Sequence, residues 1–270
     1  MTSDRHNRSG RAKRSLGQNF LIDQGIVGRI IKAANIEQGD EVIEIGPGRG
    51  ALTERLLEAG ARVTAIELDR DLIEPLRDRF GQDSNFRIIE DDALEVDLQE
   101  LTAVEGSPVK LVANLPYNIS TAILQNLITH HKLISVMVLM FQREVVERIT
   151  AEPGNSDRGF LTVLVEASFK VERVTDVPPG AFRPVPKVWS SVVKFTPVDD
   201  PIEPISKLRT VVGAAFAHKR KTILNNLKHG YPFAAEWLLK AEVESRRRAE
   251  TLDREEWRRL LSLLGDFERL

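Results

Sequence analysis

The sequence predicts an α/β fold, with an open, mostly parallel, Rossmann-like sheet and a small C-terminal helical domain. Three observations support this prediction. Short apolar runs alternate with helical patterns over the first 200 residues, and a glycine-rich turn at residues 46–50 follows the first of these runs. From residue 201 onward only helical patterns remain. With 270 residues, the chain is long enough for both parts, and 42% of the residues are hydrophobic, which is enough to bury a core in an α/β domain of this size.

The spacing of apolar residues predicts the elements in order. A helix is expected over residues 24–35, because Ile26, Ile30 and Ile31 recur at helical spacing. Strands then alternate with helices in the βαβ rhythm of a parallel sheet, in which ligands bind at the carboxyl ends of the strands. These strands are expected at residues 41–46, 62–67, 86–90, 109–114 and 135–141.

Two further strands are expected at residues 160–171 and 188–195. The segment between them, residues 177–186, is too rich in proline for a sheet or a helix. We expect it to hold Phe182 as an aromatic wall, so that an extruded base is sandwiched between Phe182 and Tyr117. The alternative interpretation is an aromatic plug in the core beneath a loop.

Composition shifts predict the domain boundaries. Residues 1–14 carry five Lys and Arg residues against one Asp and show no apolar periodicity, which predicts a disordered basic arm. Residues 15–200 are expected to form the sheet domain. The sheet pattern stops after residues 196–201, so residues 201–270 are expected to form a helical domain.

The glycine-rich turn at residues 46–50 is typical of a cofactor site. Glycines let a ligand approach the backbone closely, and the following helix supplies free N–H groups. Glu67 ends the next strand about twenty residues later, where such folds bind a ribose diol. Asp92 follows the third strand, where its carboxylate can accept from the amino group of an adenine; the alternative is a helix cap. These features predict a cofactor that contains a nucleoside.

Read together with Ala51, the same turn also fits the G-x-G-x-x-A fingerprint of dinucleotide-binding proteins, so a nicotinamide dehydrogenase is an alternative. The acidic end of the third strand argues against it. Together with the polar motif at residues 114–117, that strand end favours a nucleoside methyl donor over a hydride carrier.

Residues 114–117, Asn-Leu-Pro-Tyr, close the strand at 109–114. An adenine N6 is a poor nucleophile, because its lone pair is delocalised into the ring. The Asn114 side-chain oxygen and the Leu115 carbonyl can accept both N6 protons and turn the lone pair toward an electrophile. Pro116 fixes the backbone there, and Tyr117 can stack on the base. Taken alone, the motif also fits a strand end followed by a proline turn.

The distribution of charge, rather than the net charge of -2, points to a nucleic-acid partner. Residues 206–230 hold six Lys and Arg residues and no acidic residue, on a helical pattern. Solvated helices usually mix both signs, so this segment predicts an RNA-docking surface. Its candidate contacts are Lys219, Arg220 and Lys221.

Other classes of site and location are disfavoured. The absence of cysteine excludes disulfides, thiolate zinc sites and cysteine nucleophiles, and agrees with a reducing compartment. The histidines form no helical H-x-x-x-H pair, so no metal site is expected. Residues 1–6 have no apolar signal core, and the longest apolar run, residues 134–141, is too short to span a bilayer. A cytoplasmic protein is therefore expected.

The chain resembles the small-subunit ribosomal RNA adenine N6,N6-dimethyltransferases. The resemblance rests on an ordered set of motifs at residues 15–21, 44–48, 114–117, 182–188 and 216–222. It implies a Rossmann-like methyltransferase sheet that uses S-adenosylmethionine as cofactor. It also implies a cytoplasmic, monomeric enzyme that dimethylates two adjacent adenines near the 3′ end of the RNA, with the small-subunit RNA or the immature small subunit as its partner.

Residue roles follow from the matching motifs. The resemblance implies cofactor contacts at Asn19, Leu21, Gly46, Glu67, Asp92 and Asn114, and base contacts at Asn114, Tyr117 and Phe182. The chain departs from the family at three positions: similar sequences usually have Asp where Trp189 stands, and commonly Arg or a polar residue where His218 and Lys219 stand. These positions lie outside the methyl-transfer set, so they concern RNA contacts rather than the reaction.

Two related functions remain open. One is a large-subunit ribosomal RNA adenine methyltransferase of the macrolide-resistance type, although residues 15–21 and 216–222 favour the small subunit. The other is a ribosome assembly factor whose methyl transfer is secondary.

Overall fold

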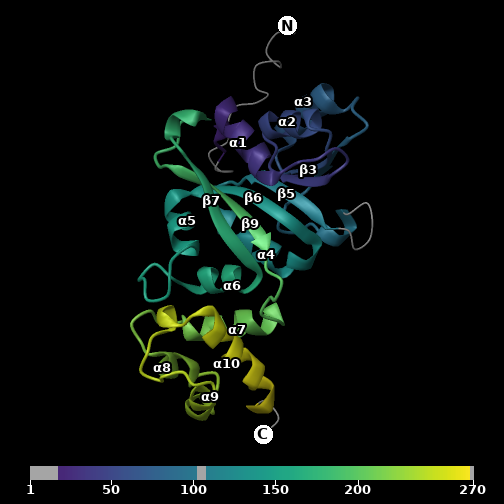
Figure 1. Cartoon of the computed structure of the whole chain (residues 1–270). Helices are drawn as coiled ribbons and strands as arrows, with labels where there is room; N and C mark the ends of the chain where they lie inside the picture. Colours follow the sequence, from purple (N-terminus) through teal and green to yellow (C-terminus); the bar gives the residue numbers. More distant parts are fainter. Residues whose placement is uncertain (1–17, 102–107, 268–270) are drawn as a thin grey trace. The chain divides into compact units, whose positions relative to one another are not determined.

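The computed structural model describes residues 18–101 and 108–267 (Figure 1). The chain divides into two compact units. Unit 1 comprises the described residues up to Arg143 together with Val171–Pro197, and unit 2 comprises Glu144–Lys170 together with the described residues from Val198 onward. This division differs from the single boundary at residue 200 that the sequence predicts. The predicted basic arm, residues 1–14, lies outside the described residues.

A seven-stranded sheet organises unit 1, with the strand order β4-β3-β2-β5-β6-β9-β7. Neighbouring strands from β4 to β6 are parallel, and β9 pairs with β6 antiparallel. The predicted open, mostly parallel α/β sheet is thus confirmed. The strands are β2 (Glu41–Ile45), β3 (Arg62–Glu67), β4 (Phe86–Glu90), β5 (Val109–Asn114), β6 (Ile134–Gln142), β7 (Phe169–Val177) and β9 (Ser190–Pro197).

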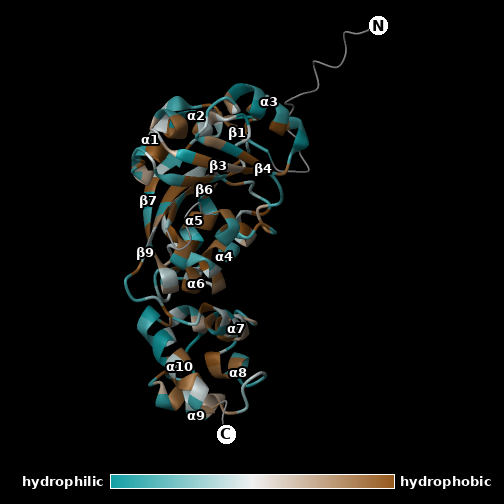
Figure 2. Cartoon of the chain, turned by 90° about the vertical axis from the view of Figure 1, so that its right-hand side faces the viewer, coloured by the Kyte–Doolittle hydropathy of each residue, from teal (hydrophilic) through white to brown (hydrophobic). Residues whose placement is uncertain are grey.

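Helix α1 (Gln24–Ala34) precedes the first parallel strand, β2. Helices α2 (Ala51–Glu58), α3 (Arg70–Phe80) and α4 (Ser120–Thr129) connect successive parallel strands. The predicted first helix is confirmed. It begins where the Asp23 side chain accepts from the Ile26 N–H, and it ends at Asn35, whose φ of 48° is left-handed. Its buried face packs into a core cluster with residues of β2, β5 and β6. The apolar run of β6 is visible in the hydropathy colouring (Figure 2).

A second, two-stranded sheet joins distant parts of unit 1. Strand β1 (Phe20–Leu21) pairs antiparallel with β8 (Phe182–Arg183), and Leu21 lies opposite Phe182. The Phe182 side chain is fully buried in the same core cluster as Leu21. Its ring therefore has no face open to a base, and the predicted aromatic wall is wrong for this structure. Phe182 is the core plug of the alternative interpretation, and it holds β1 in place.

Helices make up most of unit 2: α5 (Arg143–Ile149), α6 (Phe160–Ser168), α7 (Ile205–Ala215), α8 (Ile223–Leu227), α9 (Ala234–Lys240) and α10 (Arg254–Phe267). The predicted C-terminal helical region is confirmed, but the predicted strand at 160–171 is wrong. Residues 160–168 form a helix that is buried on nearly all sides, and only Phe169 begins a strand. A run that is apolar on every face shows no helical period, so its β-branched residues misled the prediction.

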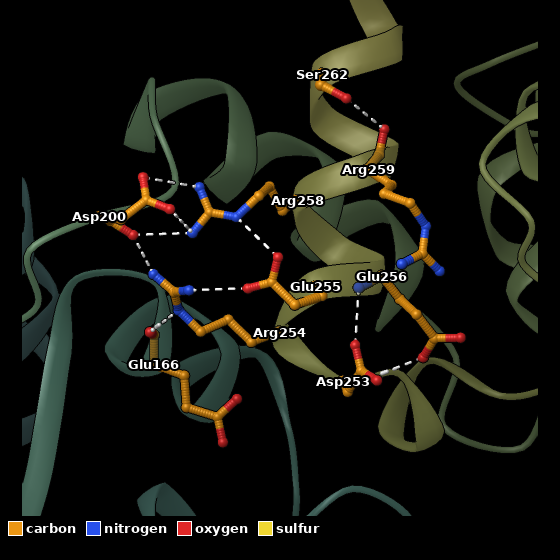
Figure 3. A network of polar contacts seen from close by, with 9 residues as sticks. All are labelled: Glu166, Asp200, Asp253, Arg254, Glu255, Glu256, Arg258, Arg259 and Ser262. Carbon is orange, nitrogen blue, oxygen red and sulfur yellow. Dashed lines mark hydrogen bonds and ion pairs between the residues drawn. The ribbon is translucent and has the colours of Figure 1, made fainter.

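Two arginines tie α6 to the C-terminal segment. The Arg158 side chain has no exposed surface and donates to both carboxylate oxygens of Glu166, at 2.5 and 2.6 Å, and to the Leu252 carbonyl at 3.2 Å. Arg254 donates to the Glu166 carbonyl at 2.8 Å and also reaches Asp200 (Figure 3). Residues 144–170 therefore fold with the C-terminal helices, which is why one boundary at residue 200 does not divide the molecule.

No helix within residues 18–101 and 108–267 is long and apolar enough to cross a membrane. Over the same ranges, no three His, Asp or Glu side chains come together in a way that could hold a metal ion.

Candidate active site

Unit 1 contains a cavity of about 210 Å³ at the carboxyl ends of its parallel strands. The cavity is lined by β1, by the glycine turn after β2, by the ends of β3 and β5, and by residues 91–93 after β4. Parallel strands end at one edge of the sheet, so segments far apart in sequence meet there. Most of the predicted site residues line this cavity: Asn19, Leu21, Gly46, Glu67, Asp92, Asn114, Leu115, Pro116 and Tyr117.

The glycine turn leaves space for a ligand. Gly46 has a φ of +67°, and a Cβ added there would meet no atom within 4 Å, so the backbone is open to the cavity. Gly48 has a φ of +58°, and a Cβ there would lie 3.0 Å from the Phe20 ring. Glycine is thus required at both positions for the left-handed backbone, and at Gly48 also for the close approach of β1.

Glu67 ends β3 and faces the glycine turn. Its Oε2 accepts from the Gly48 N–H at 3.3 Å, and its Oε1 accepts from the Asp69 N–H at 2.8 Å. Only 7% of the residue is exposed, and this burial raises the pKa of the carboxyl above its ordinary value. The two N–H groups fix the orientation of the carboxylate at the wall of the cavity.

Asp92 lies in the turn after β4. Its Oδ1 accepts from the Leu94 N–H at 2.9 Å, so the side chain caps this turn as well as lining the cavity. The alternative interpretation, a helix cap, is not formed, because residues 93–95 form a turn and the next helical segment begins only at Leu98.

Asn114 connects the end of β5 with the residue that precedes β1. Its Nδ2 donates to the Asn19 carbonyl at 3.0 Å. A carbonyl can only accept, so this contact fixes which way the amide is turned and leaves Oδ1 as the acceptor on the opposite side of the amide. The predicted role of Asn114 as an acceptor for an adenine amino group stays a prediction.

Tyr117 lines the cavity three residues after Asn114. Its hydroxyl forms a 2.6 Å hydrogen bond with the Ser190 Oγ at the start of β9, and burial raises the pKa of the phenol, so the ring stays neutral. Leu115 and Pro116 lie between the two polar residues on the same wall. The structure therefore brings the Asn-Leu-Pro-Tyr motif and the cofactor candidates to one cavity.

The three candidate RNA contacts lie in unit 2, and the cavity is lined by residues of unit 1 alone. Lys219, Arg220 and Lys221 are exposed, but they occupy the turn between α7 and α8 instead of the predicted helix. The turn is held from within, because the Asn226 Nδ2 donates to the carbonyls of Ala215 and His218, at 2.6 and 3.2 Å.

Sequence reasoning missed Glu44, in the middle of β2. Its carboxyl is 1% exposed and accepts from the Thr53 Oγ1 at 2.6 Å. Burial, reinforced by the nearby Glu67, raises the pKa of Glu44 to about 7. The available signal was a Glu in the middle of the apolar run Glu-Val-Ile-Glu-Ile. Both faces of a central parallel strand are buried, so the sequence shows no alternation of apolar and polar residues from which the burial of Glu44 could be inferred.

Glu44→Gln should change the pH dependence of stability. The folded state holds the Glu44 proton up to a pH of about 7, and the unfolded state releases it near 4.5, so this group stabilises the fold below pH 4.5. That contribution, on the order of 3 kcal/mol, is lost as the pH rises to 7. Glutamine cannot ionise and keeps an acceptor for Thr53. We expect the free energy of unfolding of the variant, relative to the parent, to increase from pH 4.5 to 7 in urea titrations. Parallel curves for the two proteins would contradict this.

Comparisons with known proteins fit this geometry. The family model described as "Ribosomal RNA adenine dimethylase" matches residues 9–266. A protein of Hahella chejuensis named "Ribosomal RNA small subunit methyltransferase A" is 46% identical over 229 residues, which cover 83% of this chain and 84% of that protein.

Two solved structures share the fold over 92% of this chain. A dimethyladenosine transferase from Plasmodium falciparum has a TM-score of 0.76 and 29% identity, with 98% of its chain covered. The 23S rRNA methyltransferase ErmE has a TM-score of 0.69 and 26% identity, with 100% of its chain covered.

Proposed function

The chain belongs to the ribosomal RNA adenine dimethylase family, and from this premise we propose that it transfers methyl groups from S-adenosylmethionine to the N6 atoms of adenines in small-subunit ribosomal RNA. The observation that carries the proposal is the orientation of Asn114, whose amide nitrogen is held by Asn19 and whose oxygen is thereby left as the acceptor at the cavity. The 46% identity to a small-subunit methyltransferase supports the choice of substrate.

The residues around the cavity fit the proposed donor. The open backbone at Gly46 leaves room for a ligand, and we assign the ribose diol to the Glu67 carboxylate, which two backbone N–H groups hold in one orientation. Asp92 is the candidate partner of the donor's adenine, and Asn19 and Leu21 close the site from β1. When bound, the sulfonium supplies an electrophilic methyl group together with its own leaving group.

The Asn-Leu-Pro-Tyr motif prepares the nucleophile. Asn114 Oδ1 and the Leu115 carbonyl accept the two N6 protons, which localises the lone pair on the nitrogen as it becomes tetrahedral. With the donor bound, the sulfonium would supply the methyl group and leave as the thioether, and the methylated nitrogen would lose one proton to water; the residues' part is to align N6 with the methyl and to hold its lone pair. Tyr117 stacks on the base, and its hydrogen bond to Ser190 holds the ring in place. A second transfer to the same nitrogen gives the N6,N6-dimethyl product, in accord with the family description.

The proposed substrate is a pair of adjacent adenines near the 3′ end of the RNA in an immature small subunit, on which the protein acts as a monomer. The target base has to leave its stack to reach the cavity, which favours a loop or another single-stranded element of a folded RNA.

Methylation assays with labelled S-adenosylmethionine test the proposal. Small-subunit RNA or immature small-subunit particles should accept label, and mapping should place it on N6 of adjacent adenines. Label confined to large-subunit RNA would favour the macrolide-resistance type, whose solved representative ErmE has a similar fold. Binding to immature particles without label would favour an assembly factor. Protection against heat by nicotinamide dinucleotide instead of S-adenosylmethionine would indicate a dehydrogenase.

Reversing the exposed charges between α7 and α8 should separate docking from chemistry. We expect Lys219→Glu/Arg220→Glu/Lys221→Glu to keep its affinity for S-adenosylmethionine and to lose stable RNA association. In a plot of the logarithm of the RNA-binding constant against the logarithm of the salt concentration, the slope of the variant should be shallower than that of the parent by about 3, because fewer phosphates are neutralised. Calorimetry and binding titrations at several salt concentrations measure both quantities.

A matched control reverses three exposed cations that already face carboxylates: Arg55 beside Glu58, Arg77 beside Glu74 and Lys240 beside Glu236. The change in net charge is the same, and such surface pairs contribute little to stability. If the control loses RNA binding to the same extent, the effect is one of overall charge, and the turn is not the docking surface.

A further inference from the structure

The loop between β8 and β9 presents apolar and cationic side chains to solvent. Val185, Val188 and Trp189 are 55%, 43% and 47% exposed, and Arg183 and Lys187 are exposed beside them. Residues 177–198 contain no Asp or Glu. Apolar side chains that face solvent do not stabilise the core, so a cluster of them on one loop indicates a binding surface. A loop that also carries cations and no carboxylates is complementary to a ligand with negative charges and flat apolar groups. A nucleic-acid strand has this chemistry.

The sheet register places Trp189 at the catalytic edge. Ser190 lies opposite Gln142 at the end of β6, and Asn114, at the end of β5, lies opposite Met140 of β6. Since β5 and β6 are parallel, both end at the same edge of the sheet, and β9 starts there. The Arg143 N–H donates to the Trp189 carbonyl at 2.9 Å and fixes the backbone of this residue.

A direct contact links this position to the predicted base site. Ser190, the next residue in the chain, bonds through its Oγ to the Tyr117 hydroxyl at 2.6 Å. This side-chain contact joins Tyr117 to the residue that directly follows Trp189, and all three residues belong to unit 1. The exposed Trp189 is thus one residue along the chain from the hydrogen-bond partner of Tyr117.

Trp189 differs from the other two tryptophans of the sequence. Trp237 and Trp257 are fully buried in unit 2, and the Trp237 indole N–H donates to the Leu260 carbonyl at 2.8 Å. Both contribute to a core, whereas about half of the Trp189 residue faces solvent on a loop. Trp offers the largest face of any side chain for stacking on a base.

We propose that Trp189 is a stacking platform for the base that neighbours the target adenine, with Arg183 and Lys187 attracting the adjoining phosphates. This inference rests on the proposed function for the identity of the target. Trp189 is then a positioning residue: it holds the strand beside the target while Tyr117 and Asn114 hold the reacting base. It also adds binding energy in unit 1, independent of the cationic turn of unit 2.

Intrinsic fluorescence tests the proposal directly, because the two buried tryptophans provide a constant background. The probe is a short RNA hairpin with adjacent adenines in its loop, titrated at low salt without S-adenosylmethionine. We expect quenching of the solvent-exposed emission on binding, and loss of this signal in Trp189→Phe. Trp189→Ala should weaken RNA binding by between about 5-fold and about 150-fold, the range for one stacked base. Trp189→Phe should recover part of the affinity.

Steady-state kinetics and a matched variant complete the test. Trp189→Ala should raise KM for RNA more than it lowers kcat, and should leave the affinity for S-adenosylmethionine unchanged. Leu239→Ala removes another exposed apolar side chain, 77% exposed on α9, and should change none of these quantities.

Three results would overturn the proposal: no quenching by RNA, unchanged RNA affinity in Trp189→Ala, or a change of oligomeric state in that variant that shows the loop to be a contact between copies of the chain. Failure of the proposed function would look different, because the hairpin would still quench Trp189 while no small-subunit RNA accepted a methyl group.

Discussion

Asn114→Ala is expected to lower the rate of methyl transfer by about 10² or more while the affinity for RNA barely changes. The amide oxygen interacts most strongly with N6 as the nitrogen becomes tetrahedral, so its loss mainly affects the transition state. The affinity for RNA is expected to depend on Tyr117 and on the cationic surfaces, which this variant keeps. Single-turnover assays with labelled S-adenosylmethionine, together with RNA titrations, measure the two effects separately.

Asn114→Asp provides the control for this variant. It keeps acceptor oxygens but loses the N–H that bonds to the Asn19 carbonyl, so the side chain is no longer held in one orientation. We expect a rate between those of the parent and of Asn114→Ala. A near-normal rate in Asn114→Ala would reject the proposed role of the amide, and equal rates in both variants would show that orientation by Asn19 is as important as the acceptor itself.

Arg158→Met should destabilise unit 2 by about 3 kcal/mol, the lower end of the range for breaking a buried ion pair, because the Arg158 side chain is fully buried but 30% of the Glu166 side chain is exposed. The variant leaves the Glu166 carboxylate without its two N–H donors, and it leaves the carbonyls of Ala151 and Leu252 without a hydrogen bond. Urea denaturation followed by the fluorescence of the buried Trp237 and Trp257 reports on this unit.

The double variant Arg158→Met/Glu166→Gln separates the cost of leaving the Glu166 charge unpaired from the cost of losing the Arg158 side chain itself. It removes the uncompensated carboxylate, so we expect it to be more stable than Arg158→Met alone. A loss below about 1 kcal/mol in the single variant would show that solvent reaches Glu166 freely and that the pair contributes little.

Much of the sheet could be predicted from the sequence, because its parallel strands are short, mostly apolar runs separated by helical patterns and turns. The strands at residues 62–67, 86–90 and 109–114 have the predicted bounds. The helix at Phe160–Ser168 could not be predicted, since burial on nearly every side removes its period. Strands β1 and β8 have two residues each, and their pairing joins positions about 160 residues apart, which no local pattern reveals.

Most of the site could be predicted for a related reason. Gly46, Glu67, Asp92 and Asn114 all follow or end strands, and parallel strands gather their carboxyl ends at one edge of the sheet. Phe182 was misplaced because a proline-rich segment limits the backbone but does not tell whether an aromatic ring points into the core or out of it. The exposure of Trp189 likewise depends on long-range packing, so it appears only in the structure.

The assembly of unit 2 from two separate segments has a consequence for attempts to produce the catalytic part alone. Helix α6 packs against α7 and α10. A truncated protein that stops near residue 200 would keep α6 without these neighbours, so its buried side chains, such as Leu161 and Leu164, would lie open to water and favour aggregation. We therefore expect a soluble catalytic part to need two deletions, one that ends before β7 at Phe169 and removes α6, and one of the C-terminal segment, with a new linker in place of the first.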